Sequence, residues 1–311
     1  MIALGVINGF LEVCQMRIFV TGASGFIGSA LVSDLIAAGH QVVGLARSDS
    51  SAAALTSAGA DVCRGTLEDL DVLRAAAEGS DGVVNLGFSH DLSQHEAAAR
   101  AELRAIETFG EALQGSNRPL VIASGGPAGT ERDTPPPSRS PRAGAAPVAL
   151  SFAEHGVRSS VVRLAPTVHD RGRCDFVKLL VDIARAKGVS GYLGDGSNRW
   201  PSLHRLDAAG LFRLAVEKAP AGSILHGVGE EGVTVRAIAE IIGRHLNVPL
   251  APIVAEDAAA HFGFQAALIG RDMLASSTLT RELLGWQPTH AGLLDDIDSA
   301  LFFDNVALSR S

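Results

Sequence analysis

The chain has 311 residues, of which 47% are hydrophobic and 19% charged, and its net charge at pH 7 is −8. This length allows one large domain or two modest ones with a substantial buried core, as in an alanine- and glycine-rich α/β protein. The acidic balance and three scattered lysines exclude the usual basic surface for nucleic acid, and we predict no membrane partner.

The three cysteines and residues 1–15 bear on the predicted location of the protein in the cell. Cys14, Cys63 and Cys174 are odd in number and far apart, which is typical of free thiols in a reducing cytoplasm. Residues 1–15 are mildly apolar, but the run is short and broken and has no basic start or cleavage site. We interpret residues 1–15 as an N-terminal extension that is disordered or precedes the true start at Met16.

A glycine-rich turn follows the first predicted strand. The apolar run 18–20 ends at Thr21, and a helical pattern begins within the next five residues. A strand, a glycine turn and a helix form the unit that holds a pyrophosphate, because the helix N-terminus offers free N–H groups and a positive dipole. We therefore predict dinucleotide binding by Thr21, Gly22, Ser24, Gly25, Phe26, Ile27 and Gly28.

Short apolar runs alternate with helical patterns along the rest of the chain, which predicts a parallel, doubly wound sheet. The predicted strands are 18–20, 41–46, 61–64, 82–86, 119–123, 158–164 and 224–228. The predicted helices are 26–38, 51–58, 69–78, 94–113, 148–155, 175–187, 207–218 and 235–246, with a mostly helical tail (258–264, 279–284, 293–301). Residues 192–197 are predicted to form a glycine-punctuated turn.

The segment 125–147 is rich in Pro, Ser, Arg and Gly, and the three consecutive prolines 135–137 exclude regular structure there. It is either a linker or a loop over the active site; we prefer the loop because the alternating pattern resumes after it. The predicted fold is a Rossmann-type α/β domain over residues 16–165 with a smaller C-terminal substrate lobe over 166–311. Residues around 199–228 are expected to return to the first domain.

Several motifs occur together in a family-like order. They are Thr21–Gly28 as TGxxGxxG, 84–88 at the fourth strand, 121–124 in the fifth strand and ending in Ser124, 163–168 at the sixth strand and 203–207 further on. In this order the chain resembles the extended and atypical branch of the short-chain dehydrogenase/reductase superfamily, whose members are often described as NAD-dependent epimerases/dehydratases. The resemblance covers roughly residues 16–286.

One part of the family pattern is missing. The superfamily's catalytic pair is Tyr-x-x-x-Lys, yet Tyr192 is the only tyrosine and Lys178 is the first lysine. By the family's usual spacing the pair falls near Ser138 and Arg142. A serine hydroxyl is a poor acid, so the ordinary mechanism does not carry over. Arg142 could still hold the nicotinamide ribose.

The resemblance also implies a layout for the cofactor. Arg47 ends the second strand, where an arginine suits a 2′-phosphate, with Ser48 as a further donor; the alternative is a solvated surface arginine. We therefore predict NADP(H) in preference to NAD(H). The other predicted cofactor contacts are Thr66, Leu67, Leu86, Gly87, Phe88, Ser124, Leu164 and Pro166.

The candidate catalytic residues follow predicted strands. Ser124 could hydrogen-bond a substrate carbonyl, or it is a plain turn serine. His90, beside Asp91, and His169, beside Asp170, are alternative proton donors or ordinary bonded histidines. His204 is expected to serve packing between lobes. The histidines have no metal-ligand spacing, so we assign no metal.

The leading hypothesis is an NADP(H)-dependent oxidoreductase acting on a small carbonyl or alcohol. The first alternative is a non-catalytic dinucleotide binder, such as a redox sensor or regulatory protein, which the missing pair favours. The second is a nucleotide-sugar epimerase or dehydratase, ranked lower because that chemistry uses the same tyrosine. The long helix 94–113 could form a homodimer interface or pack internally.

Overall fold

A seven-stranded parallel sheet dominates the computed structural model of the chain, which describes residues 15–89, 95–133 and 141–308. The strand order is β10-β6-β5-β4-β1-β2-β3, and every neighbouring pair runs parallel. The predicted fold class is confirmed. The strands are β1 (Arg17–Thr21), β2 (Gln41–Ala46), β3 (Asp61–Arg64), β4 (Gly82–Asn85), β5 (Pro119–Gly125), β6 (Arg158–Leu164) and β10 (Ser223–Gly227).

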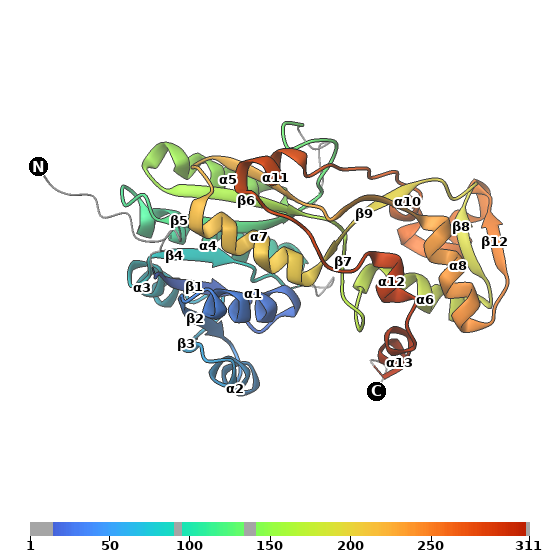
Figure 1. The fold of residues 1–311 in the computed structure, drawn as a ribbon, viewed down its shortest axis with the longest axis horizontal. Coiled ribbons are helices and arrows are strands. Elements are labelled where there is room, and N and C mark those ends of the chain that lie inside the picture. Colours follow the sequence, from blue (N-terminus) through green and yellow to red (C-terminus); the bar gives the residue numbers. More distant parts are fainter. Residues whose placement is uncertain (1–14, 90–94, 134–140, 309–311) are drawn as a thin grey trace, which may run out of the picture.

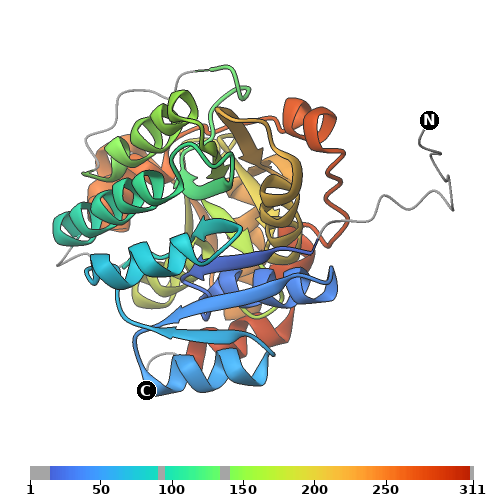
Figure 2. The same ribbon diagram turned by 90° about the vertical axis from the view of Figure 1, so that its left-hand side faces the viewer.

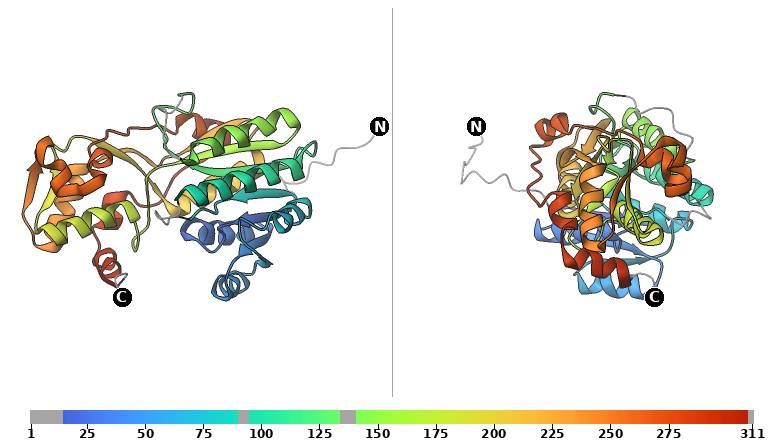
Figure 3. Two further views of the ribbon diagram at one scale, coloured as in Figure 1. Left: turned by 180° about the vertical axis from the view of Figure 1, so that it is seen from behind. Right: turned by 90° about the vertical axis from the view of Figure 1, so that its right-hand side faces the viewer.

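Helices cover both faces of this sheet, as parallel crossovers require. On one face α1 and α7 pack on a core that contains Val20, Val121 and Val162 (Figure 1). On the other face α3, α4 and α5 pack on Phe19 and Ile122, and α4 and α5 lie in front in the left view of Figure 3. The helices are α1 (Phe26–Ala37), α2 (Asp49–Ser57), α3 (Leu70–Glu78), α4 (His95–Leu113), α5 (Ala145–Ser151) and α7 (Arg205–Lys218).

Figure 2 looks from the side of the sheet and shows its strands between these two helix layers. The alternation of side chains explains the layers, because successive residues of a strand point to opposite faces. Phe19 and Val20 accordingly belong to different cores. The same alternation places Ser124 on the α4 and α5 face, two residues after Ile122.

A second core lies beside the sheet, on the right of Figure 1. It contains a three-stranded sheet of order β11-β9-β7 and a parallel pair of β12 and β8. Its buried side chains include Val177, Trp200 and Ile238. Its elements are β7 (Thr167–His169), α6 (Asp175–Lys187), β8 (Ser190–Leu193), β9 (Arg199–His204), β11 (Glu230–Thr234), α8 (Val235–Leu246), β12 (Leu250–Ile253), α9 (Ala258–Phe262), α10 (Ala266–Ile269), α12 (Leu293–Ile297) and α13 (Ala300–Leu308).

The structure corrects two predicted segments. The predicted turn 192–197 is wrong at its start, because Tyr192 lies in β8 and only the residues from Gly194 turn. β8 pairs with β12, about sixty residues later, and no local pattern predicts that pairing. The helix predicted at 148–155 begins earlier, at Ala145, and its end is the 3₁₀ turn Phe152–His155.

Some predictions fall outside the described residues. They include the disorder of residues 1–14, the proline run 135–137, Ser138, and His90 with Asp91. The cytoplasmic location, the homodimer and the division into two domains stay predictions. In the described part of the chain no helix is long and apolar enough to cross a membrane.

Candidate functional site

The turn between β1 and α1 is shaped by its glycines. Gly22 has φ +64°, and its carbonyl oxygen accepts a hydrogen bond from the Gly25 N–H at 2.9 Å. A Cβ on Gly28 would lie 2.0 Å from that oxygen, so only glycine allows α1 to pack this close. Among the described residues no side chain caps α1, and its first turn holds no acidic residue. The free N–H groups fit a pyrophosphate.

The segment after β4 locks this turn in place. The Thr21 hydroxyl donates to Asn85 Oδ1 at 2.6 Å and accepts from the Gly87 N–H at 3.0 Å. A Cβ on Gly22 would lie 2.8 Å from the Leu86 carbonyl carbon. Asn85 is fully buried, yet its Nδ2 has no partner in the part of the chain that the structure describes. An orphaned donor at this edge fits a bound dinucleotide. Sequence reasoning missed Asn85, although a polar residue ending an apolar strand was a visible signal.

The ends of β2 and β3 hold the residues predicted for the adenosine side. Arg47 is exposed, and its side chain forms no hydrogen bond or ion pair within the described ranges. Ser48 accepts from the Ser51 N–H at 3.2 Å and so caps α2. Thr66 is tied to Asp69, and a Cβ on Gly87 would touch the Leu67 side chain at 3.3 Å. Arg47 follows β2 and Leu67 follows β3, and both of these strands lie on the same side of β1.

On the other side of β1, polar residues occupy equivalent positions on three strands. Ser124 on β5 is in register with Arg163 on β6, and Arg163 is in register with His226 on β10. Ser124 is half-buried, whereas Arg163 and His226 are buried. Arg163 Nη1 donates to the Asp133 carbonyl at 3.0 Å and lies 3.4 Å from His226 Nε2. The row brings a hydroxyl and a cation to one edge.

His226 is held in its neutral form. Its Nδ1 must donate to the Ser276 carbonyl, 2.8 Å away, because a carbonyl oxygen only accepts. Burial lowers the pKa of His226, and the nearby Arg163 charge lowers it further, against the opposing effects of Ser276 and Glu131. The neutral imidazole can then present Nε2 to Arg163.

The loop after β5 is fastened to the last part of the chain, which includes α11 (Thr278–Leu284). Glu131 Oε1 accepts from the Thr280 N–H at 2.7 Å and from its hydroxyl at 2.6 Å. The Gly129 N–H donates to the Leu274 carbonyl, and the Ser276 N–H donates to the Gly129 carbonyl. The described part of the loop is thus held against the strand ends near Ser124.

The Arg142 side chain lies at the carboxyl ends of β4 and β5. Its Nε and Nη2 donate to the Glu102 carboxylate at 2.6 to 3.0 Å, and Nη2 also reaches the Ala123 carbonyl at 3.3 Å. Its Cζ lies 4.1 Å from the centroid of the Phe88 ring. The predicted residues Phe88 and Arg142 therefore meet beside Ser124. Sequence reasoning missed Glu102, whose one signal was its helical spacing with the apolar Ala105, Ile106 and Phe109 of the same helix.

His169 is in a different environment. Its Nδ1 lies 2.8 Å from Asp296 Oδ2, and both side chains are 1% exposed. His204 Nε2 lies 3.6 Å from the same carboxylate, and its Nδ1 caps α7. Burial lowers the pKa of His204. His169 is brought to the junction of the second core rather than to Ser124, and His90 lies outside the described residues.

His204, Asp207 and His290 offer possible ligand atoms within 4.8 Å of one another. The two imidazole rings are stacked at 9° with centroids 4.8 Å apart, so their in-plane lone pairs do not converge on one ion. The Asp207 carboxylate already accepts from the Thr289 and His290 N–H groups and from His290 Nδ1. We assign no metal here.

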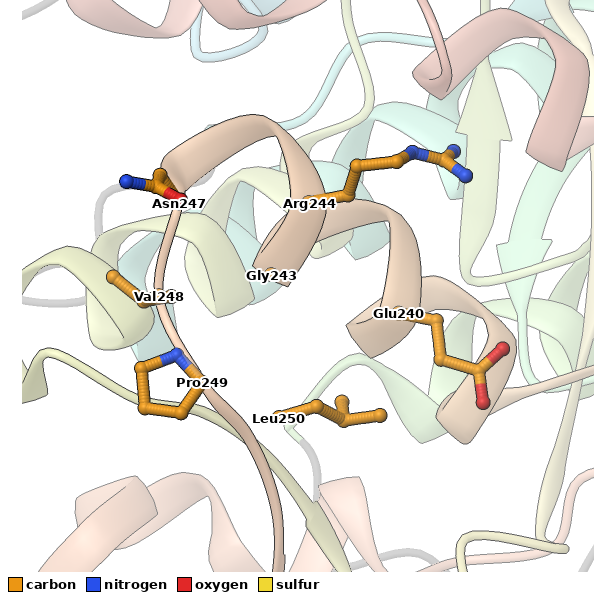
Figure 4. Close-up of a pocket in the computed structure, with 7 residues that line it drawn as sticks. All are labelled: Glu240, Gly243, Arg244, Asn247, Val248, Pro249 and Leu250. Atoms are coloured by element: carbon orange, nitrogen blue, oxygen red, sulfur yellow. The ribbon is translucent and has the colours of Figure 1, made fainter.

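Two further predicted contacts lie at the end of β6, and one surface hollow lies away from the sheet edge. Leu164 and Pro166, at and after the end of β6, are half-buried, and Leu164 packs on the α1 and α7 core. Figure 4 shows a shallow hollow lined by Glu240, Gly243, Arg244, Asn247, Val248, Pro249 and Leu250. It lies at the C-terminal end of α8, at the far end of the second core from β1 (Figure 1), and is separate from the sheet edge.

Comparison with known proteins agrees with this architecture. The family model described as "NAD dependent epimerase/dehydratase family" matches residues 18–226. An uncharacterized protein of Schizosaccharomyces pombe is 47% identical over 295 residues, covering 93% of this chain and 100% of that protein. The 4-hydroxy-2-methyl-3-oxo-4-farnesyl-3,4-dihydroquinoline-1-oxide ketoreductase of Stigmatella aurantiaca is 26% identical, covering 92% of this chain and 96% of the relative. The solved structure of MoeE5 with UDP-glucose and NAD has a TM-score of 0.69 at 24% identity, covering 95% of this chain and 100% of that one.

Proposed function

Because this chain belongs to the NAD dependent epimerase/dehydratase family, we propose that it is an oxidoreductase that transfers hydride between NADP(H) and a small carbonyl or alcohol substrate. One observation carries the proposal. An uncapped helix N-terminus after β1 and the half-buried Ser124 hydroxyl near the end of β5 share one sheet edge. In open α/β sheets this edge is where ligands bind. A ketoreductase among the relatives supports the same reaction type.

The preference for NADP(H) rests on Arg47. The side chain is exposed at the end of β2 and forms no ion pair with the described residues, so its charge is available to a 2′-phosphate. Ser48 is engaged in capping α2, so we assign the preference to Arg47 alone. The glycine turn and Asn85 hold the cofactor, which supplies the hydride when it is bound.

The chain's own residues then orient and polarise the substrate. The Ser124 hydroxyl is placed to donate to a carbonyl oxygen, and the Arg142 guanidinium adds positive charge at the neighbouring strand end. His169 is paired with Asp296 and 1% exposed, so we assign it to holding the second core in place. Substrate binds between the sheet edge and the second core in this proposal.

A second candidate is a non-catalytic dinucleotide binder. The observation that favours it is the position of Tyr192, the only tyrosine, which lies in β8 of the second core and is 7% exposed. No phenol can therefore take the family's proton-donor role at the sheet edge. A nucleotide-sugar epimerase or dehydratase ranks lower for the same reason, although MoeE5 binds a nucleotide sugar.

The test combines binding with turnover. We expect the purified protein to quench or enhance NADPH fluorescence on binding and to oxidise NADPH with some member of a carbonyl panel. Ser124→Ala should then lower kcat/KM on the order of a hundredfold, because it removes a donor to the developing charge. The matched control is Ser33→Ala, an exposed serine of α1.

Two results separate the candidates. NADPH binding with no turnover of any carbonyl compound would favour the non-catalytic binder. Turnover that Ser124→Ala leaves at the wild-type rate would remove Ser124 from the mechanism.

A further inference from the structure

Glu102 is a buried carboxylate in the middle of α4. Its side chain is 0% exposed, and the neighbouring buried residues of the helix, Ala105, Ile106 and Phe109, are apolar. Removing a carboxylate from water is costly unless it is paired and hydrogen-bonded. Both Glu102 oxygens accept from Arg142, in two Nε contacts of 3.0 and 2.7 Å and one Nη2 contact of 2.6 Å. Packing alone does not explain a fully buried carboxylate at position 102.

The pair fixes the Arg142 guanidinium from three sides. Glu102 holds it from α4, the Ala123 carbonyl accepts from Nη2 on β5, and the Phe88 ring lies 4.1 Å from Cζ after β4. Arg142 itself follows a stretch outside the described residues and lies in the 3₁₀ turn Pro141–Gly144. A planar guanidinium held by two parallel hydrogen bonds and a ring has little freedom to turn.

The strand order of the sheet indicates which half of a dinucleotide would lie near the Arg142 guanidinium. The glycine turn after β1 holds the pyrophosphate, and β2 and β3 extend the sheet on the adenosine side. The other half of the cofactor therefore crosses β4 and β5, on the opposite side of β1. Arg142 lies at the ends of these two strands. This step rests on the cofactor binding proposed above.

We infer that Glu102 is a positioning residue that holds Arg142 at the nicotinamide side and supplies negative charge that lets this side accept the oxidised ring. The oxidised nicotinamide ring carries a positive charge, and the reduced ring is neutral. A guanidinium nearby repels the oxidised form and leaves the reduced form almost unaffected. Glu102 offsets that repulsion. The Glu102 charge should therefore change the ratio of the NADP⁺ affinity to the NADPH affinity, in addition to any effect on folding.

The experiment measures dissociation constants of the whole chain for NADP⁺ and NADPH by titration. Glu102→Gln keeps the shape of the side chain but makes the local charge more positive by one unit. We expect the ratio of the NADP⁺ to the NADPH dissociation constant to rise on the order of fivefold. Glu107→Gln, an exposed residue of the same helix, removes the same charge and should leave the ratio unchanged.

The double variant Glu102→Gln with Arg142→Gln removes both charges and should return the ratio to the wild-type value. A purely structural role would weaken both cofactors equally and leave the ratio constant in every variant, which would overturn the inference. If wild-type protein binds neither cofactor, the proposed function falls and this inference falls with it. If wild type binds both and Glu102→Gln keeps the ratio, only the inference falls.

A second variant covers poor folding of Glu102→Gln. Arg142→Gln leaves the Glu102 carboxylate without its bidentate partner, so the ratio should fall below wild type as the pH rises and the carboxylate ionises. If the ratio of the NADP⁺ to the NADPH dissociation constant of Arg142→Gln stays at the wild-type value while the pH is raised, the inference is also overturned.

Discussion

The two sides of the sheet edge are built from different materials. On the side of β1 to β3 the main chain forms the site: Gly22 turns with φ +64°, and α1 begins with free N–H groups. On the side of β4, β5, β6 and β10 the edge is made of paired charged and polar side chains, such as Glu102 with Arg142 and Glu131 with Thr280. The first side depends on the absence of side chains. The second depends on hydrogen bonds between paired side chains. We call the edge at β1 to β3 the backbone side and the edge at β4, β5, β6 and β10 the side-chain side.

This difference teaches where each side is fragile. A backbone site fails when an atom is added, because the chain has no room to move. A side-chain site fails when a partner is removed, because a buried polar group is left without its hydrogen bond. The following four predictions test the contrast, beginning with the largest expected effect.

Gly28→Ala should damage the backbone side most. The new Cβ would lie 2.0 Å from the Gly22 carbonyl oxygen, so the turn or the helix must shift. We expect a loss of about 3 kcal/mol in the free energy of unfolding and loss of detectable cofactor binding. Urea denaturation and NADPH titration measure the two effects.

The control is Gly210→Ala in α7, where an added Cβ meets no atom within 4 Å. It should be neutral or stabilising by up to about 1 kcal/mol, since alanine is the better helix former. Equal effects of the two substitutions would contradict the steric explanation.

Thr280→Val should weaken the side-chain side by about 2 kcal/mol. The Thr280 hydroxyl donates to Glu131 Oε1 and accepts from the His226 N–H at 2.7 Å, and valine provides neither bond. Chemical denaturation gives the stability change. The exposed Thr278→Val in the same helix should change it by less than about 0.5 kcal/mol.

The free energy of unfolding should fall in acid because of His226, which lies on the side-chain side. Burial lowers the pKa of His226 below its ordinary value of 6.5, so below pH 6.5 the unfolded chain binds a proton that the folded chain refuses. The contribution is complete above pH 6.5 and is lost as the pH falls through the folded pKa. In His226→Asn the amide can still donate to Ser276, so unfolding of this variant from pH 7.5 to 5 should show a shallower fall than wild type. Parallel curves would argue against a neutral His226.

Arg47→Ala should have the smallest effect on the fold and a selective effect on binding. The side chain is exposed, so the stability change should lie within about 0.5 kcal/mol. Preference for NADPH over NADH should drop about tenfold, which corresponds to about 1.4 kcal/mol. Competitive titration of the two cofactors measures it. Equal binding by wild type would rule out the assigned role.

The contrast also explains what the sequence could predict. The seven strands and the glycine turn follow from local periodicity and from residues within eight positions of one another, such as Thr21 and Gly28. The Glu131 and Thr280 pair joins residues 149 positions apart, and no local pattern links them. The last two residues of β8 fall in the predicted turn 192–197 for the same reason, because β8 pairs with β12 about sixty residues later. Glu102 is the clearest case, because its burial depends on Arg142, forty positions away.

The order in which the strands enter the sheet has a consequence for synthesis. β10 flanks β6, yet residues 167–204 of the second core are made between them. The ribosome must therefore release β7, α6, β8 and β9 of the second core before the first sheet gains its last strand. Glu131 waits for a partner 149 residues downstream, which at about 5–20 residues per second is on the order of ten seconds. One edge of β6 stays unpaired until β10 is made, and the Glu131 carboxylate stays without this partner until Thr280 is made, so chaperones have exposed groups to protect over both intervals.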